Sequence, residues 1–124
     1  MNNRIAIFPG SFDPFTKGHL DIVQRAIPLF DKIIIAIGTN STKKRTFSAD
    51  LMVDKIQTLF PESANVETKT YEGLTAIFAK KENATFILRG LRNGLDLDYE
   101  TPISQVNQLI NENLESIFLI TKPE

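Results

Sequence analysis

The sequence predicts an α/β fold in which a five-stranded parallel sheet carries helices on both faces. Short β-branched runs alternate with longer amphipathic segments along the 124 residues, which is typical of successive βαβ units. The second run, Ile33–Ile37, is apolar at every position, as expected for a strand covered on both faces. Because crossovers between parallel strands are right-handed, we expect the strand order 3-2-1-4-5.

The first strand and helix follow from the apolar pattern near the N-terminus. Ile5–Phe8 is a short apolar run that ends at Pro9-Gly10, so we expect a buried strand followed by a turn. From Gly18 to Phe30 the apolar residues recur at helical spacing. Pro28 lies near the end of this pattern and should distort the last turn of the helix.

The segment after the second strand predicts a loop, a helix and a third strand. Residues 40–47 are polar and basic, which indicates a loop. Ser48 is a plausible N-cap for the helix that follows, and Pro61 should end that helix. Val66–Tyr71 alternates between apolar and polar residues, as a half-covered strand does.

The second half of the chain repeats the alternation. Residues 96–114 have a helical pattern, in which Pro102 is acceptable only in the first turn or at a kink. The remaining expected elements are a short helix with Leu74, Ile77 and Phe78 on one face, a strand at Thr85–Leu88 that ends at Arg89-Gly90, and a strand at Ile117–Ile120.

Composition excludes several classes of protein. A length of 124 residues indicates one domain, which we expect to span residues 1–124. The absence of cysteine rules out a disulfide scaffold, and a single histidine argues against a multi-histidine zinc site. A net charge of −1 disfavours nucleic-acid binding, and no apolar run is long enough for a membrane span or a secretory signal. A cytoplasmic location is the expectation.

The first polar segment at the expected ligand edge of the sheet runs from Phe8 to His19. It matches neither the P-loop nor the GxGxxG fingerprint. Thr16 can cap the next helix and place His19 in its first turn, where outward backbone N–H groups attract phosphate. A histidine there could stabilise negative charge on a phosphoryl oxygen. The alternative is an ordinary turn with a surface histidine.

Two further segments carry clustered cations. Lys43, Lys44 and Arg45 follow the second strand and could meet a phosphate, although a solvated basic loop would have the same composition. Arg89 and Arg92 follow the fourth strand and suit a multiply charged anion. The alternative for these two arginines is an ordinary turn in which they pair with Asp96 and Glu100, and such pairs are compatible with a binding role.

Taken together, these motifs resemble the bacterial-type phosphopantetheine adenylyltransferases of the HxGH nucleotidyltransferase superfamily. The resemblance runs from Ile5 to Thr121 and has Thr16 at the first position of the signature. It implies a Rossmann-like nucleotide-binding fold, a homohexamer, and a reaction of ATP with 4′-phosphopantetheine that yields dephospho-coenzyme A and pyrophosphate in coenzyme A biosynthesis, with Mg²⁺. No protein metal ligand is expected.

The resemblance also implies roles for individual residues. The expected catalytic residues are His19, Lys43 and Arg92. The phosphopantetheine site would comprise Ser11, Lys43, Leu74, Thr75 and Arg89, and the ATP site would comprise Ser11, Phe12, His19, Gly90, Leu91, Arg92 and Glu100.

The chain departs from the family pattern in two places. The family continues past the fifth strand with a hydroxyl-rich loop and a closing helix, so we expect a domain truncated at its C-terminus. Met52 stands where many family members have arginine. A truncated, non-catalytic phosphopantetheine-binding module is therefore an alternative to the enzyme. A receiver-type signalling domain would share the βα alternation, but Pro9-Gly10 ends the first strand without the acidic pair of such domains.

Overall fold

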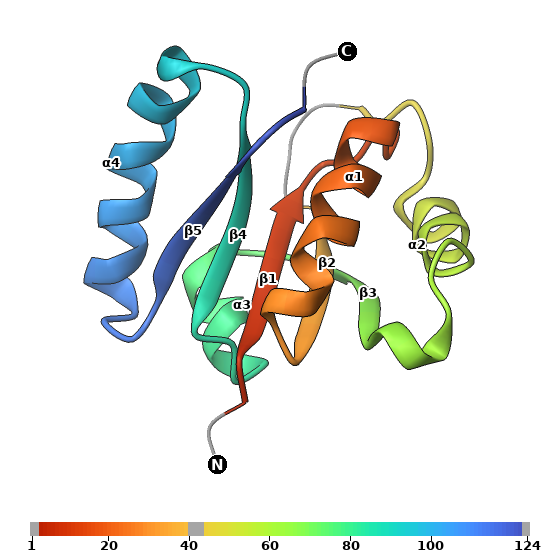
Figure 1. Cartoon of the computed structure of the whole chain (residues 1–124), viewed down its shortest axis with the longest axis horizontal. Helices are drawn as coiled ribbons and strands as arrows, with labels where there is room; N and C mark the ends of the chain where they lie inside the picture. Colours follow the sequence, from red (N-terminus) through yellow and green to blue (C-terminus); the bar gives the residue numbers. More distant parts are fainter. Residues whose placement is uncertain (1–2, 40–43, 123–124) are drawn as a thin grey trace.

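The computed structural model describes residues 3–39 and 44–122 and contains one parallel sheet. Its strand order is β3-β2-β1-β4-β5, which confirms the predicted order and the α/β class. Figure 1 shows β1 near the centre of the sheet with α4 beside β4 and β5. The strands are β1 (Ile5–Gly10), β2 (Lys32–Gly38), β3 (Val66–Tyr71), β4 (Phe86–Leu91) and β5 (Glu115–Ile120); the helices are α1 (Lys17–Ala26), α2 (Ala49–Gln57), α3 (Thr75–Lys81) and α4 (Gly94–Ile110).

Two apolar clusters cover the two faces of the sheet, because successive strand side chains point to opposite faces. On one face, Ile33, Ile35 and Ile37 of β2 pack in the cluster that includes the buried residues of α1 and α2. On the other face, Ile34 and Ala36 pack with buried residues of α3. The continuous apolar run therefore fills both layers, as predicted.

Helix boundaries follow the expected local signals. The Oγ of Ser48 accepts a hydrogen bond of 3.1 Å from the backbone N–H of Leu51, which confirms the predicted N-cap of α2. Pro28 lies in a short 3-10 turn, Ile27–Leu29, directly after α1, so the last turn is distorted as expected. Among the described residues, no helix combines the length and the apolar character needed to cross a membrane.

The predicted turn at Pro9-Gly10 is wrong, because β1 continues to Gly10 and both residues pair in register with β2. Within a strand the N and the C=O of one residue face the same side. The C=O of Pro9 accepts a hydrogen bond from Arg89, so its nitrogen also faces β4. The register of β1 with β4 covers only Ala6 and Ile7, so the missing N–H of Pro9 interrupts no ladder.

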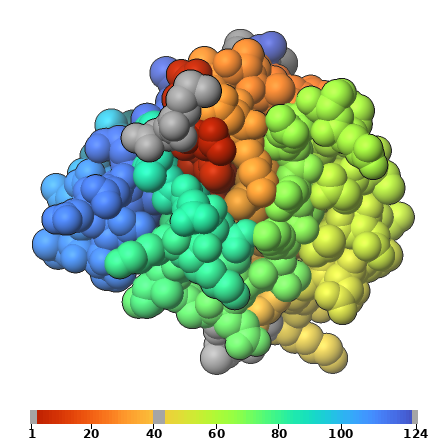
Figure 2. All heavy atoms as spheres, turned by 90° about the horizontal axis from the view of Figure 1, so that it is seen from below, coloured from red at the N-terminus to blue at the C-terminus, as the bar shows by residue number. Residues whose placement is uncertain are grey.

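The long helix differs from its expected position. It begins after the N-cap Asn93 and ends at Ile110, so Pro102 lies in its interior and not in the first turn. In α3, Phe78 is buried as the pattern suggested, whereas Leu74 and Ile77 are 55% and 57% exposed. Seen from the edge where the strands begin, α4 forms one side of the molecule next to the segment that enters β4 (Figure 2).

Candidate functional site

The carboxyl ends of β1 and β4 enclose two adjacent hollows, as expected at a switch point of a parallel sheet. The larger one, called here the large cavity, has a volume of about 710 Å³, and the smaller one, called the groove, has about 230 Å³. Arg89 and Glu100 line both. The predicted residues that line the large cavity are Ser11, Phe12, His19, Arg89, Gly90, Arg92 and Glu100, and those that line the groove are Thr75, Arg89 and Glu100.

Two of the predicted residues that the structure describes do not line either hollow. Leu74 is the exposed residue before the first turn of α3, and Leu91 is the last residue of β4, paired with Ile120. Lys43 lies outside the described residues.

His19 is held by the first turn of α1, as the sequence predicted. The backbone N–H of His19 donates to the Oγ1 of Thr16 at 3.4 Å, and the backbone N–H of Thr16 donates to the Nδ1 of His19 at 2.9 Å. This is a reciprocal capping box in which histidine occupies the position that glutamate or glutamine usually takes. The imidazole is therefore fixed by the same bonds that begin the helix.

These bonds determine which nitrogen of His19 carries the proton. An amide N–H can only donate, so the Nδ1 of His19 must be its unprotonated acceptor, and a neutral ring then carries its proton on Nε2. Burial, followed by the positive charge of Arg89, lowers the pKa of His19 below 6.5. At neutral pH the site therefore contains a neutral imidazole with an Nε2–H donor.

Phe12 forms the wall behind the imidazole. Its ring is 3% exposed and meets the ring of His19 edge-on, with a centroid distance of 4.9 Å. The backbone of Phe12 has a φ of 44°, in the left-handed region that non-glycine residues rarely occupy. A Cβ on Gly10 would lie 2.9 Å from the Cζ of Phe12, so glycine at position 10 permits this close approach.

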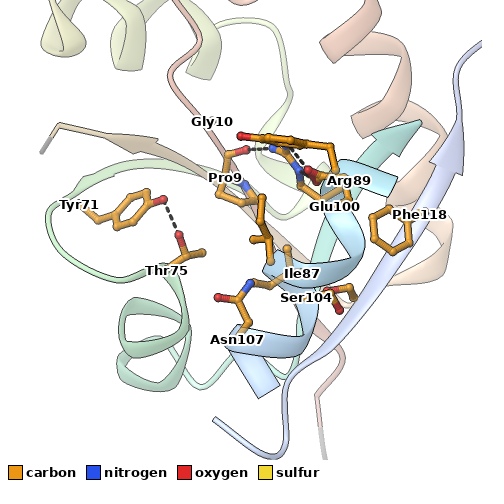
Figure 3. Close-up of a pocket in the computed structure, with 13 residues that line it drawn as sticks. Pro9, Gly10, Tyr71, Thr75, Ile87, Arg89, Glu100, Ser104, Asn107 and Phe118 are labelled. Carbon is orange, nitrogen blue, oxygen red and sulfur yellow. Dashed lines mark hydrogen bonds and ion pairs between the residues drawn. The ribbon is translucent and has the colours of Figure 1, made fainter. Parts of the chain in front are cut away.

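Arg89 lines both hollows, and Figure 3 shows it in the groove with Pro9 and Glu100. Its Nη1 donates to the C=O of Pro9 at 2.7 Å, and its Nε and Nη2 donate to the two carboxylate oxygens of Glu100. The Glu100 side chain is 7% exposed, whereas that of Arg89 is 35% exposed. The ion pair of Arg89 with Glu100, which the sequence led us to expect of an ordinary turn, is therefore present. In this pair the guanidinium of Arg89 still lines both hollows.

Arg92 lies two residues before the start of α4, and its side chain is 77% exposed, compared with 35% for Arg89. Its Nε and Nη2 donate to the carboxylate of Asp96 at 3.0 and 3.2 Å. The hydrogen bonds to Asp96 raise the pKa of Arg92, and the same guanidinium lowers the pKa of Asp96. This second forecast pair is also formed, and it holds Arg92 at the rim of the large cavity.

The groove is also lined by residues that the sequence did not predict as part of the site. Asn107 and Ser104 of α4 line it together with Tyr71, whose hydroxyl lies 2.8 Å from the Oγ1 of Thr75 (Figure 3). Residues 99, 103 and 107 recur every four positions, so one face of the helix supplies the wall. That spacing was visible in the sequence, but it did not show which face of the helix turns toward the sheet.

The acidic side chains that line the large cavity all accept hydrogen bonds from protein groups. Asp13 accepts from two backbone N–H groups, Asp96 from Arg92, and Glu100 from Arg89. Within residues 3–39 and 44–122, no group of three or more histidine and acidic side chains is arranged to hold a metal ion. The donors of the site are cations, hydroxyls and N–H groups, which suit phosphate oxygens.

Sequence comparison relates the chain to nucleotidyltransferases. The Cytidylyltransferase-like family profile matches residues 7–122. A phosphopantetheine adenylyltransferase from Cytophaga hutchinsonii is 56% identical over 121 residues, which cover 98% of this chain and 81% of that protein. One from Christiangramia forsetii is 52% identical over 116 residues, which cover 94% of this chain and 76% of that protein.

Structural comparison identifies the fold. A bifunctional NMN adenylyltransferase/ADP ribose pyrophosphatase from Francisella tularensis, complexed with AMP and a manganese ion, superposes with a TM-score of 0.66 at 20% identity, covering 98% of this chain and 38% of that one. A lipopolysaccharide core biosynthesis protein from Thermoplasma volcanium superposes with a TM-score of 0.68 at 15% identity and covers 98% of both chains. At these identities the likeness shows a shared Rossmann-like fold alone.

Proposed function

The chain belongs to the cytidylyltransferase-like family and, within it, to the phosphopantetheine adenylyltransferases, and from this premise we propose how its two hollows carry out adenylyl transfer. In this reaction a phosphate oxygen of 4′-phosphopantetheine attacks the α-phosphorus of ATP. The bond from the α-phosphorus to the bridging oxygen breaks, pyrophosphate leaves, and dephospho-coenzyme A forms. The activity belongs to coenzyme A biosynthesis.

The observation that carries this assignment is the place of Arg89 between the two hollows. A phosphate bound by this guanidinium lies next to the large cavity, where ATP would bind, while the rest of its molecule extends into the groove. Asn107, Ser104 and the paired hydroxyls of Tyr71 and Thr75 supply polar groups for the amides of a pantetheine arm. One site then holds both reactants with the attacking oxygen beside the α-phosphorus.

His19 acts in this proposal as a neutral donor to a phosphoryl oxygen of ATP. The Nε2–H of His19 is available because Nδ1 is already bonded to the backbone of Thr16. Negative charge grows on the oxygens around the α-phosphorus during the transfer, and a fixed donor stabilises that charge without reorganisation. Arg92 at the cavity rim adds a positive charge, and a phosphate nucleophile requires no protein base.

The remaining roles rest on position and on family resemblance. Ser11, the backbone of Phe12, and Gly90 line the nucleotide side of the site. Lys43 is proposed to bind the attacking phosphate. Leu74 and Leu91 line neither hollow, so their places beside the pantetheine arm and the nucleotide rest on the family resemblance alone. Mg²⁺ would enter bound to the phosphates of ATP, which commonly supply ligands to this ion.

A homohexamer in the cytoplasm completes the proposal. The support for self-association is the outer surface of α4, which leaves large apolar side chains in solvent, and such patches mark protein interfaces. These side chains are Leu95 (76%), Val106 (52%), Leu109 (87%) and Ile110 (41% exposed).

Pyrophosphate release tests the function and separates it from the binding-module alternative. The chain is incubated with ATP and phosphopantetheine, with ATP alone, and with ATP and pantetheine that lacks the phosphate. The proposal predicts release only with the first mixture. Release that does not depend on the phosphate of the acceptor would refute the role of Arg89, and binding of both substrates without release would favour the module.

A further inference from the structure

We propose that Arg45 is a positioning residue that turns the backbone N–H groups of Phe12 and Asp13 toward the phosphates of ATP. This inference rests on the proposed function, because it assigns the nucleotide to the large cavity. It concerns a residue that does not line the cavity, and it adds the loop after β2 to the machinery of the site.

The guanidinium of Arg45 binds three backbone carbonyls from two loops. Its Nη1 donates to the C=O of Ser11 at 2.7 Å, and its Nη2 donates to the C=O of Phe12 at 3.3 Å. Its Nε donates to the C=O of Phe47 at 2.8 Å, which fixes the guanidinium to its own loop. The planar fork of arginine suits two neighbouring carbonyls that point the same way.

These contacts set the direction of two peptide units. In a trans peptide the C=O and the N–H point to opposite sides. The C=O groups of Ser11 and Phe12 point toward Arg45, which lies outside the cavity wall, so the N–H groups of Phe12 and Asp13 point to the other side. Phe12 and Asp13 both line the large cavity, and within residues 3–39 and 44–122 neither N–H has a hydrogen-bond acceptor.

Two adjacent N–H groups that converge beside a residue in the left-handed region form an anion-binding concavity. Phe12 has the required positive φ of 44°. Its ring is buried against Phe8, Phe15 and His19, with centroid distances between 4.9 and 5.3 Å. The ring anchors the residue from inside while Arg45 holds its carbonyl from outside, so the strained backbone has one orientation.

Asp13 makes the reciprocal connection between the loops. Its Oδ2 accepts from the backbone N–H of Thr46 and its Oδ1 accepts from that of Phe47, both at 2.8 Å. Arg45 therefore binds backbone carbonyls of the segment after β1, while Asp13 of that segment binds backbone N–H groups of residues 46 and 47. This reciprocal set of bonds is called the clasp. Because Asp13 is the residue whose own N–H faces the cavity, the clasp fixes that peptide from both sides.

The test measures ATP affinity by titration calorimetry in the full chain and in three variants. Arg45→Ala removes all three bonds, and Arg45→Lys keeps the charge but lacks the rigid planar fork that holds the three carbonyls in fixed directions. Arg4→Ala removes the same charge at the amino end of β1 and is the matched control. We expect the Kd for ATP to rise about tenfold in Arg45→Ala, as loss of charge-assisted positioning suggests, and to stay within about twofold in Arg4→Ala.

The comparison of Arg45→Lys with Arg45→Ala shows whether Arg45 acts by orienting the two peptide units or only through its positive charge. Positioning predicts that Arg45→Lys also loses most of the affinity, while kcat at saturating ATP stays within about threefold in both variants, because these N–H groups bind the phosphates before and during transfer. Full affinity in Arg45→Lys, or unchanged affinity in Arg45→Ala, would overturn the inference. If Arg45→Ala does not fold, the affinity of Arg45→Lys decides by itself. A wild-type chain that binds ATP but transfers nothing would remove the proposed function and leave this inference standing.

Discussion

His19 caps the first turn of α1 and, in the proposed reaction, donates a hydrogen bond to a phosphoryl oxygen. The substitution His19→Gln separates these two roles. Glutamine is one of the usual residues at this position of a capping box, so its side-chain oxygen can accept the N–H of Thr16 that the imidazole now accepts. The variant keeps the beginning of α1 but loses the ring and its fixed Nε2–H donor.

The expected magnitudes come from the contacts that the ring makes. It lies 4.9 to 6.2 Å, centroid to centroid, from the rings of Phe8, Phe12 and Phe15. Each such pair contributes about 0.5–1.5 kcal/mol beyond buried area, and glutamine recovers part of the contact, so we expect a loss of about 1–2 kcal/mol in unfolding free energy. Loss of one oriented donor to a developing charge should lower kcat about 100- to 1,000-fold.

Urea unfolding and steady-state pyrophosphate release are measured on the same preparations of wild type, His19→Gln and His19→Ala. We expect His19→Ala to be less stable than His19→Gln by about 1 kcal/mol, because alanine leaves the Thr16 N–H without its acceptor, while kcat is equally low in both. A kcat for His19→Gln within about threefold of wild type would refute the catalytic role. A kcat that falls only in proportion to the folded fraction would do the same.

Three further predictions follow from single contacts. Gly10→Ala should destabilise the fold by about 1–3 kcal/mol, since the new Cβ would lie 2.9 Å from the ring of Phe12, and an unchanged urea midpoint would contradict that geometry. Hydrogen bonds from backbone N–H groups, that of Thr46 first, lower the pKa of Asp13 below 3.8, so its contribution to stability is present above pH 3.8 and is lost as the pH falls through the folded pKa. The stability difference between wild type and Asp13→Asn should therefore shrink as the pH falls below about 3.8, and a difference that stays constant there would argue against the bonds. Asn107→Leu should raise the KM for phosphopantetheine about tenfold and leave the KM for ATP within about twofold, whereas equal changes in both would remove the groove from the acceptor site.

The sheet could be predicted because its determinants are local in the sequence. The uninterrupted apolar run of β2 requires two covered faces, and right-handed crossovers then limit the strand order. The turn predicted at Pro9 is wrong because its determinant is not local. A proline usually ends a strand, and only the early divergence of β4 from β1 makes room for one inside this strand.

The candidate site could be predicted only in part. Motifs at the strand ends led to His19, Arg89 and Glu100, which the fold brings to one edge. The clasp between Asp13 and Arg45 was not foreseen, because a carboxylate bonded to backbone groups 33 and 34 residues away leaves no periodic signal.

Transfer of labelled phosphorus tests the central claim most directly. The chain is incubated with phosphopantetheine and ATP that carries a radioactive α-phosphorus, and the products are separated by chromatography. Adenylyl transfer predicts that the label appears in dephospho-coenzyme A and is absent from pyrophosphate. Labelled free AMP formed together with a modified phosphopantetheine that carries no label would contradict attack of the acceptor on the α-phosphorus and with it the account of the site.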